Sequence, residues 1–339
     1  MPLEKQASML GPASTPVLQG LTTAVYGLVL PETRAMVRRL WSERPESLFE
    51  CAYEDRQDAA HHVFIDAWKG WVAPHVGGLA AFAHHYTTNG SSEAIRESVW
   101  DLARAASSSS RAPQLHVFAG EYEGYSAYAR AAGMQIVTHD RAKWRHASFD
   151  AGAIHRFYVS QPSAIDGNLW PDFPRFLGEM ARQAVEVAVD LAYVGAVPDL
   201  QFFDRSSPAV SQVFFSLSKV FGLFYHRVGG VLSRSAMLGL EGNKWFKNMF
   251  SLYLGTSLIR ETTDPTTLPQ KYQPVQREAC RMIAEQHGLA VTPSDVILLA
   301  SSPSGDYPQA FRRGPGYRWC LTPTMDRLLR ESREGEPRA

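Results

Sequence analysis

The feature that most constrains the fold of this chain is an alternation of short apolar runs with longer helical patterns, which begins near residue 50. Such an alternation is typical of βαβ units, whose parallel strands pair in one sheet that is flanked by helices. The strands that we predict from the apolar runs are Leu115–Ala119, Met134–Thr138, His155–Ser160, Glu186–Tyr193 and Val213–Ser216. The pattern therefore predicts an α/β fold with a mostly parallel sheet.

Helical patterns and changes of pattern divide the chain into three parts. The helices predicted around the strands are Ser92–Ser107, Tyr125–Ala132, Pro171–Gln183 and Gly242–Arg260. Residues 1–45 lack a sustained period and are predicted to form an N-terminal arm with a short helix near Glu32–Trp41. After Pro265 we predict a small α+β domain from Gln273–His287, Val296–Ser301, Tyr317–Leu321 and Pro323–Glu331. We therefore expect an arm (1–45), a large domain (46–245) and an interdomain helix with a small C-terminal domain (246–339).

Composition excludes several functional classes. The chain has 339 residues with 34 Lys+Arg and 34 Asp+Glu, so no net charge attracts nucleic acid or an anionic membrane. No uncharged apolar run reaches the ~18 residues of a membrane span, and the N-terminus lacks the layout of a secretion signal. The three cysteines, Cys51, Cys280 and Cys320, show no metal-type spacing and fit a reducing compartment. We expect a cytoplasmic protein with no metal site and no nucleic-acid or membrane partner.

Lys219 is the most informative single residue, since it stands between hydroxyls in the run Ser216-Leu217-Ser218-Lys219 and precedes Arg227 closely. A lysine that is buried near other cations loses its proton readily, and only the neutral amine attacks a carbonyl. The guanidinium of Arg227 suits a phosphate, and Ser216 and Ser218 offer further hydrogen-bond donors. The segment therefore indicates a site that holds an aldehyde cofactor as a Schiff base and binds its phosphate.

A small polar turn, Asn89-Gly90-Ser91-Ser92, leads into the predicted helix Ser92–Ser107. Gly90 allows a close approach to the backbone, and the N–H groups of Ser91 and Ser92 have no partner inside the helix. These groups and the helix dipole attract a phosphate. The turn predicts a phosphate site, with an ordinary capping turn as the alternative.

Asp190 places a carboxylate inside the apolar, β-branched run Val187–Tyr193. A buried carboxylate needs a cationic partner. A pyridinium nitrogen would serve, because Asp190 would raise its pKa and keep it protonated, and the charged ring is then an electron sink. A cap at the strand end is the alternative role for Asp190. Tyr193 is placed to reach the phenolic oxygen of such a ring and Tyr122 to stack on it, although either can be an ordinary core tyrosine.

These motifs stand in the order found in the fold-type I pyridoxal-phosphate enzymes, and the chain resembles their class I/II aminotransferases, the aspartate and histidinol-phosphate aminotransferase group. The resemblance rests on Asn89–Ile95, Tyr122, Asp190-x-Ala192-Tyr193, Ser216-x-Ser218-Lys219-x-x-Gly222, Arg227 and Arg318 within Tyr317–Pro323. It implies a large domain with a sheet of seven-stranded type and pyridoxal 5'-phosphate as the cofactor. It also implies that Arg318 binds the substrate's α-carboxylate and that the protein is a homodimer with shared active sites.

The chain departs from the family in the segment Ser160–Trp170, which normally gives an asparagine to the phenolic oxygen of the cofactor. Ala164 stands at that position, and Ser163 and Asn168 are the candidates to replace the asparagine. The loss of this donor shifts the pKa of the Schiff base. The arm also lacks a match to the family's Gly-x-Pro lid, and both departures favour a specialised, biosynthetic substrate.

The resemblance predicts an aminotransferase that moves the α-amino group of an amino acid to a keto acid. Lys219 would act as base and acid, with Asp190 and Tyr193 supporting the ring. The nearest alternative keeps the cofactor and changes the reaction, to that of a lyase, a β- or γ-replacement enzyme or a cyclising enzyme of natural-product biosynthesis. A sugar-amine aminotransferase, which does not need Arg318, and a sensor protein, which needs a DNA-binding module, are the remaining alternatives.

Overall fold

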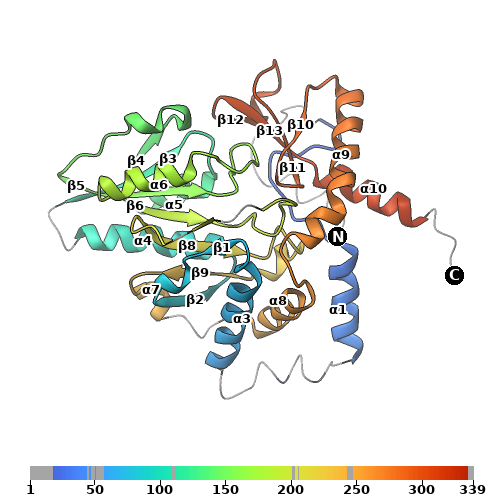
Figure 1. Ribbon diagram of the computed structural model, residues 1–339, viewed down its shortest axis with the longest axis horizontal. Coiled ribbons are helices and arrows are strands. Elements are labelled where there is room, and N and C mark those ends of the chain that lie inside the picture. Colours follow the sequence, from blue (N-terminus) through green and yellow to red (C-terminus); the bar gives the residue numbers. More distant parts are fainter. Residues whose placement is uncertain are drawn as a thin grey trace.

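The computed structural model describes residues 18–43, 46, 50, 57–107, 111–200, 203–204, 206–242 and 247–334. Figure 1 shows a large sheet with helices on both of its faces and, to one side, a smaller sheet with two helices. Within the described residues, no helix is both long and apolar enough to cross a membrane. The expected boundary residues 45 and 245 lie outside the described residues, so the division into three parts stays a prediction.

The large sheet has seven strands in the order β2-β9-β8-β6-β5-β3-β4. Their bounds are β2 (His84–Thr88), β3 (Ala112–Phe118), β4 (Gln135–His139), β5 (Ala153–Ser160), β6 (Glu186–Asp190), β8 (Val210–Ser216) and β9 (Gly229–Ser233). Strand β9 runs antiparallel to both of its neighbours, and the other pairs are parallel. The predicted α/β class with a mostly parallel sheet is confirmed.

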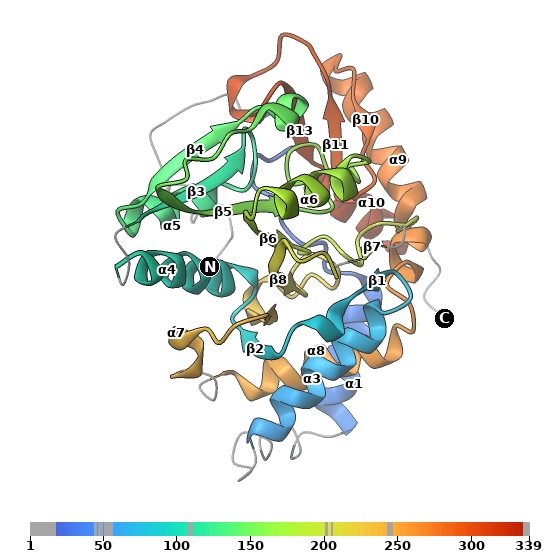
Figure 2. The same ribbon diagram turned by 60° about the vertical axis from the view of Figure 1, so that its left-hand side comes forward.

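Both faces of this sheet are buried, because helices cover each of them (Figure 2). The helices of one face are α4 (Ser91–Ser107) and α5 (Glu123–Ala131), and those of the other are α3 (Gln57–Val72), α6 (Phe173–Arg182) and α8 (Met249–Glu261). Neighbouring residues of β8 point to opposite faces, as the pleat requires. Phe214 packs in the α4 layer, whereas Phe215 packs in the α3 layer and stacks on Trp68 with ring centroids 3.9 Å apart. Such two-sided burial explains why the central strands are continuous apolar runs.

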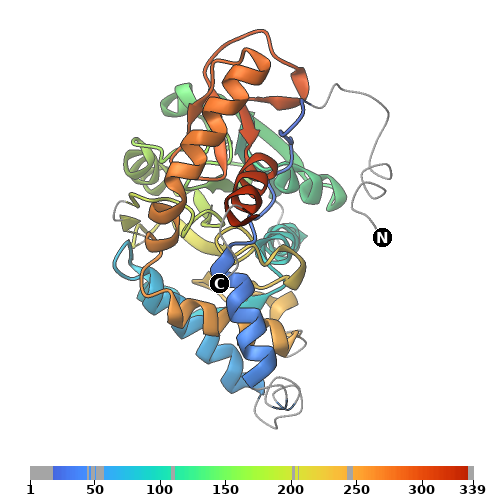
Figure 3. The ribbon, with the colours of Figure 1, turned by 90° about the vertical axis from the view of Figure 1, so that its right-hand side faces the viewer.

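The smaller sheet has four antiparallel strands in the order β10-β11-β13-β12, and we call this sheet and its two helices the small domain. Its elements are α9 (Thr267–His287), β10 (Thr292–Pro293), β11 (Leu299–Ser302), β12 (Arg312–Arg313), β13 (Gly316–Cys320) and α10 (Thr322–Glu334). The arm runs past this domain before it enters α1 (Pro31–Glu43), as Figure 3 shows. The N–H of Cys320 donates to the carbonyl of Thr22 at 3.2 Å, and the Thr322 hydroxyl donates to the carbonyl of Tyr26 at 2.8 Å. The arm is therefore held by the small domain through its own backbone.

Three differences from the predicted elements bear on the site. Strands β2 and β9 were not predicted, and together they form one end of the large sheet. The strand predicted to reach Tyr193 ends at Asp190, because the chain turns there and the N–H of Val194 donates to the carbonyl of Leu191. Other helices and strands that were not predicted include α3, the paired short strands β1 (Val76–Gly77) and β7 (Phe203–Asp204), α7 (Leu238–Glu241), and the short strands β10 and β12.

Candidate active site

The carboxyl ends of the parallel strands meet at one edge of the large sheet, where α/β proteins bind their ligands. Ser160 ends β5, Asp190 ends β6 and Ser216 ends β8, while the start of the antiparallel β9 brings Arg227 to the same edge. A cavity of about 370 Å³ opens at this edge, within the range of ligand sites. Its lining includes the predicted residues Ser91, Ser92, Tyr122, Asp190, Tyr193, Ser216, Ser218, Lys219, Arg227 and Arg318. The fold therefore brings together motifs that lie far apart in the sequence.

Lys219 lies in the turn after β8, and its Nζ donates to the carbonyl oxygen of Val25 in the arm. Burial lowers the pKa of this amine to about 8. Cys320 and Asp190 oppose the shift, while the charges of Arg318 and Arg227 add to it. No carboxylate of the described residues forms an ion pair with Lys219. About a tenth of the amine is therefore neutral and nucleophilic at pH 7.

Asp190 is 5% exposed, and burial raises the pKa of its carboxyl to about 6. Its Oδ1 accepts from the N–H of Ala192 at 2.9 Å, and its Oδ2 accepts from the hydroxyl of Tyr125 at 3.3 Å. Within the described chain it has no cation at ion-pair distance, although Lys219 acts on it through space. A buried carboxylate in this state favours a cationic group in the cavity beside it.

The end of the cavity next to α4 is cationic and rich in donors. Gly90 has a φ of +78°, and a Cβ there would lie 2.8 Å from a guanidinium nitrogen of Arg227. Arg227 is itself left-handed, with a φ of +52°, and its Nη2 donates to the carbonyl of Asn89 at 2.9 Å. The hydroxyl of Ser216 donates to that of Ser218 at 3.0 Å. Together with the free N–H groups at the start of α4, these residues suit a phosphate.

Arg318 lines the cavity from β13 and is 6% exposed. Its Nη1 donates to the carbonyl of Ala164, and its Nη2 donates to that of Thr23 at 3.2 Å. Its Nε has no hydrogen-bond partner in the described part of the chain. A buried guanidinium that binds only carbonyl oxygens is suited to an anion such as a carboxylate.

The two predicted tyrosines both line the cavity. Tyr122 caps α5 and is 36% exposed, with its ring edge-on to Tyr125 at a centroid distance of 5.5 Å. Tyr193 is buried, which raises the pKa of its hydroxyl to about 12, although Arg318 opposes the shift. Tyr193 therefore stays a hydrogen-bond donor across the physiological range.

The structure corrects the expectation for Ser163 and Asn168, since neither of them lines the cavity. The hydroxyl of Ser163 accepts from Arg141 at 2.9 Å and from the N–H of Ile165 at 3.1 Å. The side-chain oxygen of Asn168 accepts from the N–H of Asp295 at 3.0 Å, in the small domain. The bend of the loop after β5 turns both side chains away, and it is Ala164 and Ser160 that face the cavity.

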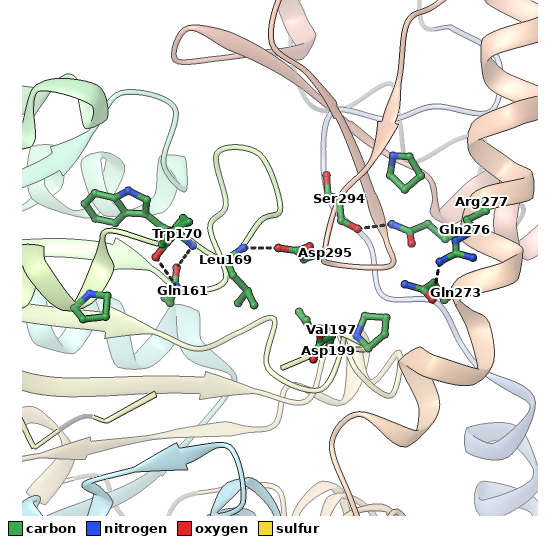
Figure 4. A pocket seen from close by; sticks show the side chains of 14 residues that line it. Gln161, Leu169, Trp170, Val197, Asp199, Gln273, Gln276, Arg277, Ser294 and Asp295 are labelled. Carbon is green, nitrogen blue, oxygen red and sulfur yellow. Dashed lines mark hydrogen bonds between the residues drawn. The ribbon is translucent and has the colours of Figure 1, made fainter. Parts of the chain in front are cut away.

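A second cavity, of about 580 Å³, lies beyond this loop, between the segment after β5 and helix α9 (Figure 4). The N–H of Leu169 donates to Asp295 across it, and Gln276 on α9 donates to the carbonyl of Ser294. Its described lining contains none of the residues that the motifs predict to bind a cofactor. Most of the residues that the motifs predict to bind a cofactor line the first cavity instead, although Gly90, Ser163 and Asn168 are not part of its described lining.

Three groups that line or border the first cavity, the arm, Arg313 and Glu121, were not predicted from the sequence as part of the site. The arm contributes Thr23–Tyr26, and its carbonyls bind Lys219 and Arg318. Arg313 lines the cavity and pairs with Glu123 at 2.7 Å. Glu121, next to Tyr122, is buried and borders the cavity through its hydrogen bonds to Ser160. Of these groups, only Glu121 could have been found from the sequence, as a carboxylate that directly follows an apolar strand. The arm binds through backbone carbonyls, which every residue has.

The structure is similar to several solved structures. For the aminotransferase from Mycobacterium tuberculosis, the TM-score is 0.65 at 16% identity, over 91% of this chain and 93% of that chain. For the histidinol-phosphate aminotransferase from Sinorhizobium meliloti in complex with pyridoxal-5'-phosphate, it is 0.61 at 16% identity, over 91% of each chain. For the L-threonine-O-3-phosphate decarboxylase from Porphyromonas gingivalis, it is 0.62 at 13% identity, over 92% of this chain and 98% of that chain.

Neither a protein-family model nor a curated protein matches the chain. At these identities the similarity shows the fold alone, which this chain shares with the two aminotransferases and the decarboxylase. The predicted fold class is thus confirmed, including the seven strands of the large sheet.

Proposed function

We propose that the first cavity binds pyridoxal 5'-phosphate and that the protein is an enzyme that uses it on an α-amino acid, as an aminotransferase. One observation carries the proposal. Lys219, an amine whose pKa burial lowers to about 8, and Asp190, a buried carboxyl without an ion-pair partner in the described chain, line the same cavity. These two groups match the two ends of the reactive ring, which are an aldehyde and a pyridine nitrogen.

The other cavity residues fit the rest of the cofactor. Arg227, Ser216, Ser218 and the start of α4 would hold its phosphate, and Tyr122 would stack on its ring. When bound, pyridoxal phosphate supplies an aldehyde that forms an imine with an amine and a ring that accepts electrons from the α-carbon of the substrate. The buried amine of Lys219 and the buried carboxyl of Asp190, which line one cavity, suit this chemistry.

Residues of the chain would bind the substrate, move its proton and stabilise the charge on the ring. Arg318 binds the carboxylate of the substrate and so fixes which bond of its α-carbon faces Lys219. The Nζ of Lys219, once it is free, takes the α-proton as a base and returns a proton as an acid. Asp190 holds its charge against the ring nitrogen, and the arm closes the cavity over Lys219.

A second candidate keeps these residues and changes the reaction, to that of a lyase, a replacement enzyme or a cyclising enzyme. It is favoured by Ala164, which offers no side-chain donor at the position where the resemblance expects an asparagine. A decarboxylase with the same fold, from Porphyromonas gingivalis, shows that the scaffold is compatible with other reactions.

Reconstitution with pyridoxal 5'-phosphate tests the cofactor. We expect a visible absorption band, and borohydride should then fix the cofactor to the tryptic peptide that contains Lys219. A colourless protein without an adduct would overturn the proposal. Conversion of the bound cofactor to pyridoxamine phosphate by an amino acid, in stoichiometric amount, then distinguishes transamination from the second candidate.

The assembly and compartment are also proposals. A homodimer with shared active sites follows from the resemblance. The cytoplasm follows from the sparse cysteines, of which Cys280 and Cys320 are free and buried. Light scattering on the purified protein tests the dimer, and a monomer at micromolar concentration would contradict it.

A further inference from the structure

Glu121 is a second buried carboxyl beside the cavity, and the function proposed above leaves it unused. It is 7% exposed and lies between β3 and α5. Its Oε1 accepts from the N–H of Ser160 at 3.1 Å, and its Oε2 bonds to the Ser160 hydroxyl at 2.6 Å. Its Oε2 also accepts from the N–H of Tyr122 at 3.3 Å. Among the described residues it forms no ion pair, so this acid is held by neutral donors alone.

Ser160 connects this acid to the cavity. It ends β5 and lines the cavity together with Ala164. Besides its bond to Glu121, its Oγ accepts from the N–H of Ala164 at 2.6 Å. A serine hydroxyl has one proton to donate and two lone pairs to accept with. The protonation of Glu121 therefore decides where the single proton of Ser160 can point.

The two states of the pair differ in what they offer to the cavity. When Glu121 is ionised it can only accept, so Ser160 must donate its proton to Glu121. When Glu121 is protonated, it can donate to Ser160 instead. The N–H of Ala164 and the Glu121 hydroxyl then fill both lone pairs of Ser160 Oγ, and its own proton is free to point into the cavity.

We infer that Glu121 and Ser160 are a positioning pair that presents a proton-controlled hydrogen-bond donor to the ring oxygen of the bound cofactor. The donor takes the part that an asparagine would have at Ala164, whose side chain offers none. The inference rests on the proposed function, because it assigns residues to the same cofactor. It goes beyond that function because the hydrogen bond to the ring oxygen would depend on the protonation of Glu121, which lies outside the cavity.

The surroundings of Glu121 place its protonation in the neutral range. Burial raises the pKa of the carboxyl to about 7. The hydrogen bonds from Ser160 and Tyr122 oppose this shift, and so does the charge of Arg141, whose guanidinium binds Ser163 and Asp166. The titratable and charged groups that interact with Glu121 from the elements around it are Arg141, Tyr125 and Tyr193, and Asp190 interacts with the same two tyrosines. The donor is therefore presented below about pH 7 and withdrawn above it.

Pyridoxamine 5'-phosphate is the probe that tests this pair, since it has the ring, the ring oxygen and the phosphate but no aldehyde for Lys219 to capture. Its dissociation constant is measured at pH 6 and pH 8.5 for the wild type, Glu121→Gln, Ser160→Ala and the double variant. Glutamine is a neutral isostere that can donate to Ser160 at every pH. Ser233→Ala removes another buried serine hydroxyl, one with no partner in the described residues, and is the control.

We expect Glu121→Gln to equal the wild type at pH 6 and to bind about tenfold more tightly at pH 8.5, the typical effect of one hydrogen bond to a charged acceptor. Ser160→Ala should bind about tenfold more weakly than the wild type at pH 6 and equally at pH 8.5. Lys219 and Asp190 titrate in every variant, so each comparison is the ratio of variant to wild type at one pH. The control ratio should stay near one.

The double variant separates the relay from a direct effect of charge. If the pair works through Ser160, Glu121→Gln changes nothing in the Ser160→Ala background; an undiminished effect there would overturn the inference. A Glu121→Gln ratio near one at both pH values would overturn it too, even if Ser160→Ala does not fold. Failure of the proposed function looks different, since the wild type itself would then bind neither pyridoxal nor pyridoxamine phosphate.

Discussion

The rate at which the protein captures pyridoxal phosphate should follow the protonation of Lys219. The perturbation is a change of pH from 6 to 10, with Lys219→Ala as the variant that removes the amine. Burial lowers the pKa of Lys219 to about 8 from the usual 10.5, and the charges of Arg318 and Arg227 reinforce the shift. Because only the neutral amine attacks an aldehyde, capture is expected to accelerate until the pH passes this lowered pKa.

The size of the effect follows from the two pKa values. With a pKa of about 8, about a tenth of Lys219 is neutral at pH 7. An exposed lysine with a pKa of 10.5 is neutral to about one part in three thousand at that pH. The buried amine therefore has about a 300-fold advantage at pH 7, and its rate should rise about tenfold from pH 6 to 7 and level off above about pH 9.

Stopped-flow absorbance at the imine band measures this rate. Nα-acetyl-lysine at matched concentration is the control, and its rate should still be rising at pH 10. Lys219→Ala should bind the cofactor reversibly, give no borohydride adduct and have no multiple turnover. If the rate of imine formation in the protein still rises tenfold between pH 9 and 10, the lowered pKa of Lys219 is wrong. A stable adduct in Lys219→Ala would remove this residue from its role.

Three further substitutions test the other ends of the cavity. Asp190→Asn should reduce turnover at least a hundredfold, about 3 kcal/mol in the transition state, and turnover near that of the wild type would contradict the pairing with a ring nitrogen. Arg318→Leu should raise the KM of an α-amino acid about tenfold or more, whereas an unchanged KM points to a substrate without an α-carboxylate, such as a sugar amine. Gly90→Ala adds a Cβ 2.8 Å from Arg227 and should weaken pyridoxal phosphate binding, by equilibrium dialysis, about tenfold; unchanged affinity would contradict the phosphate turn.

The central strands could be predicted from the sequence because helices bury both faces of the sheet, which selects continuous apolar runs. Strand β2 escapes this rule, since its residues His84-His85-Tyr86-Thr87-Thr88 are mostly polar. Strand β9 begins with Gly229-Gly230, and a Cβ on Gly230 would lie 2.4 Å from the ring of Phe215. These glycines are required by the close packing of the neighbouring strand β8, and the local sequence does not show which strand that is.

For the site, the side chains that act through their own chemistry could be predicted, whereas groups that act through the backbone could not. Asp190, Lys219 and Arg227 each stand in a short motif, and the strand ends bring them together. The part of the arm in the site was not predicted, because Val25 and Thr23 bind Lys219 and Arg318 through carbonyl oxygens that every residue has. The choice of Ser163 and Asn168 failed because spacing along a loop does not fix which way its side chains turn.

If the Glu121–Ser160 pair replaces the asparagine that the family has at the position of Ala164, the hydrogen bond to the ring oxygen becomes dependent on pH. An amide donates to a ring oxygen at every pH, whereas the hydroxyl of Ser160 can donate only while Glu121 retains its proton. Glu121 and Lys219, with pKa values of about 7 and 8, would then titrate in overlapping ranges beside one cavity. As the pH rises, the amine becomes reactive while the ring oxygen loses its donor. The two effects oppose each other, so an enzyme built this way should be most active in a narrow band near neutral pH.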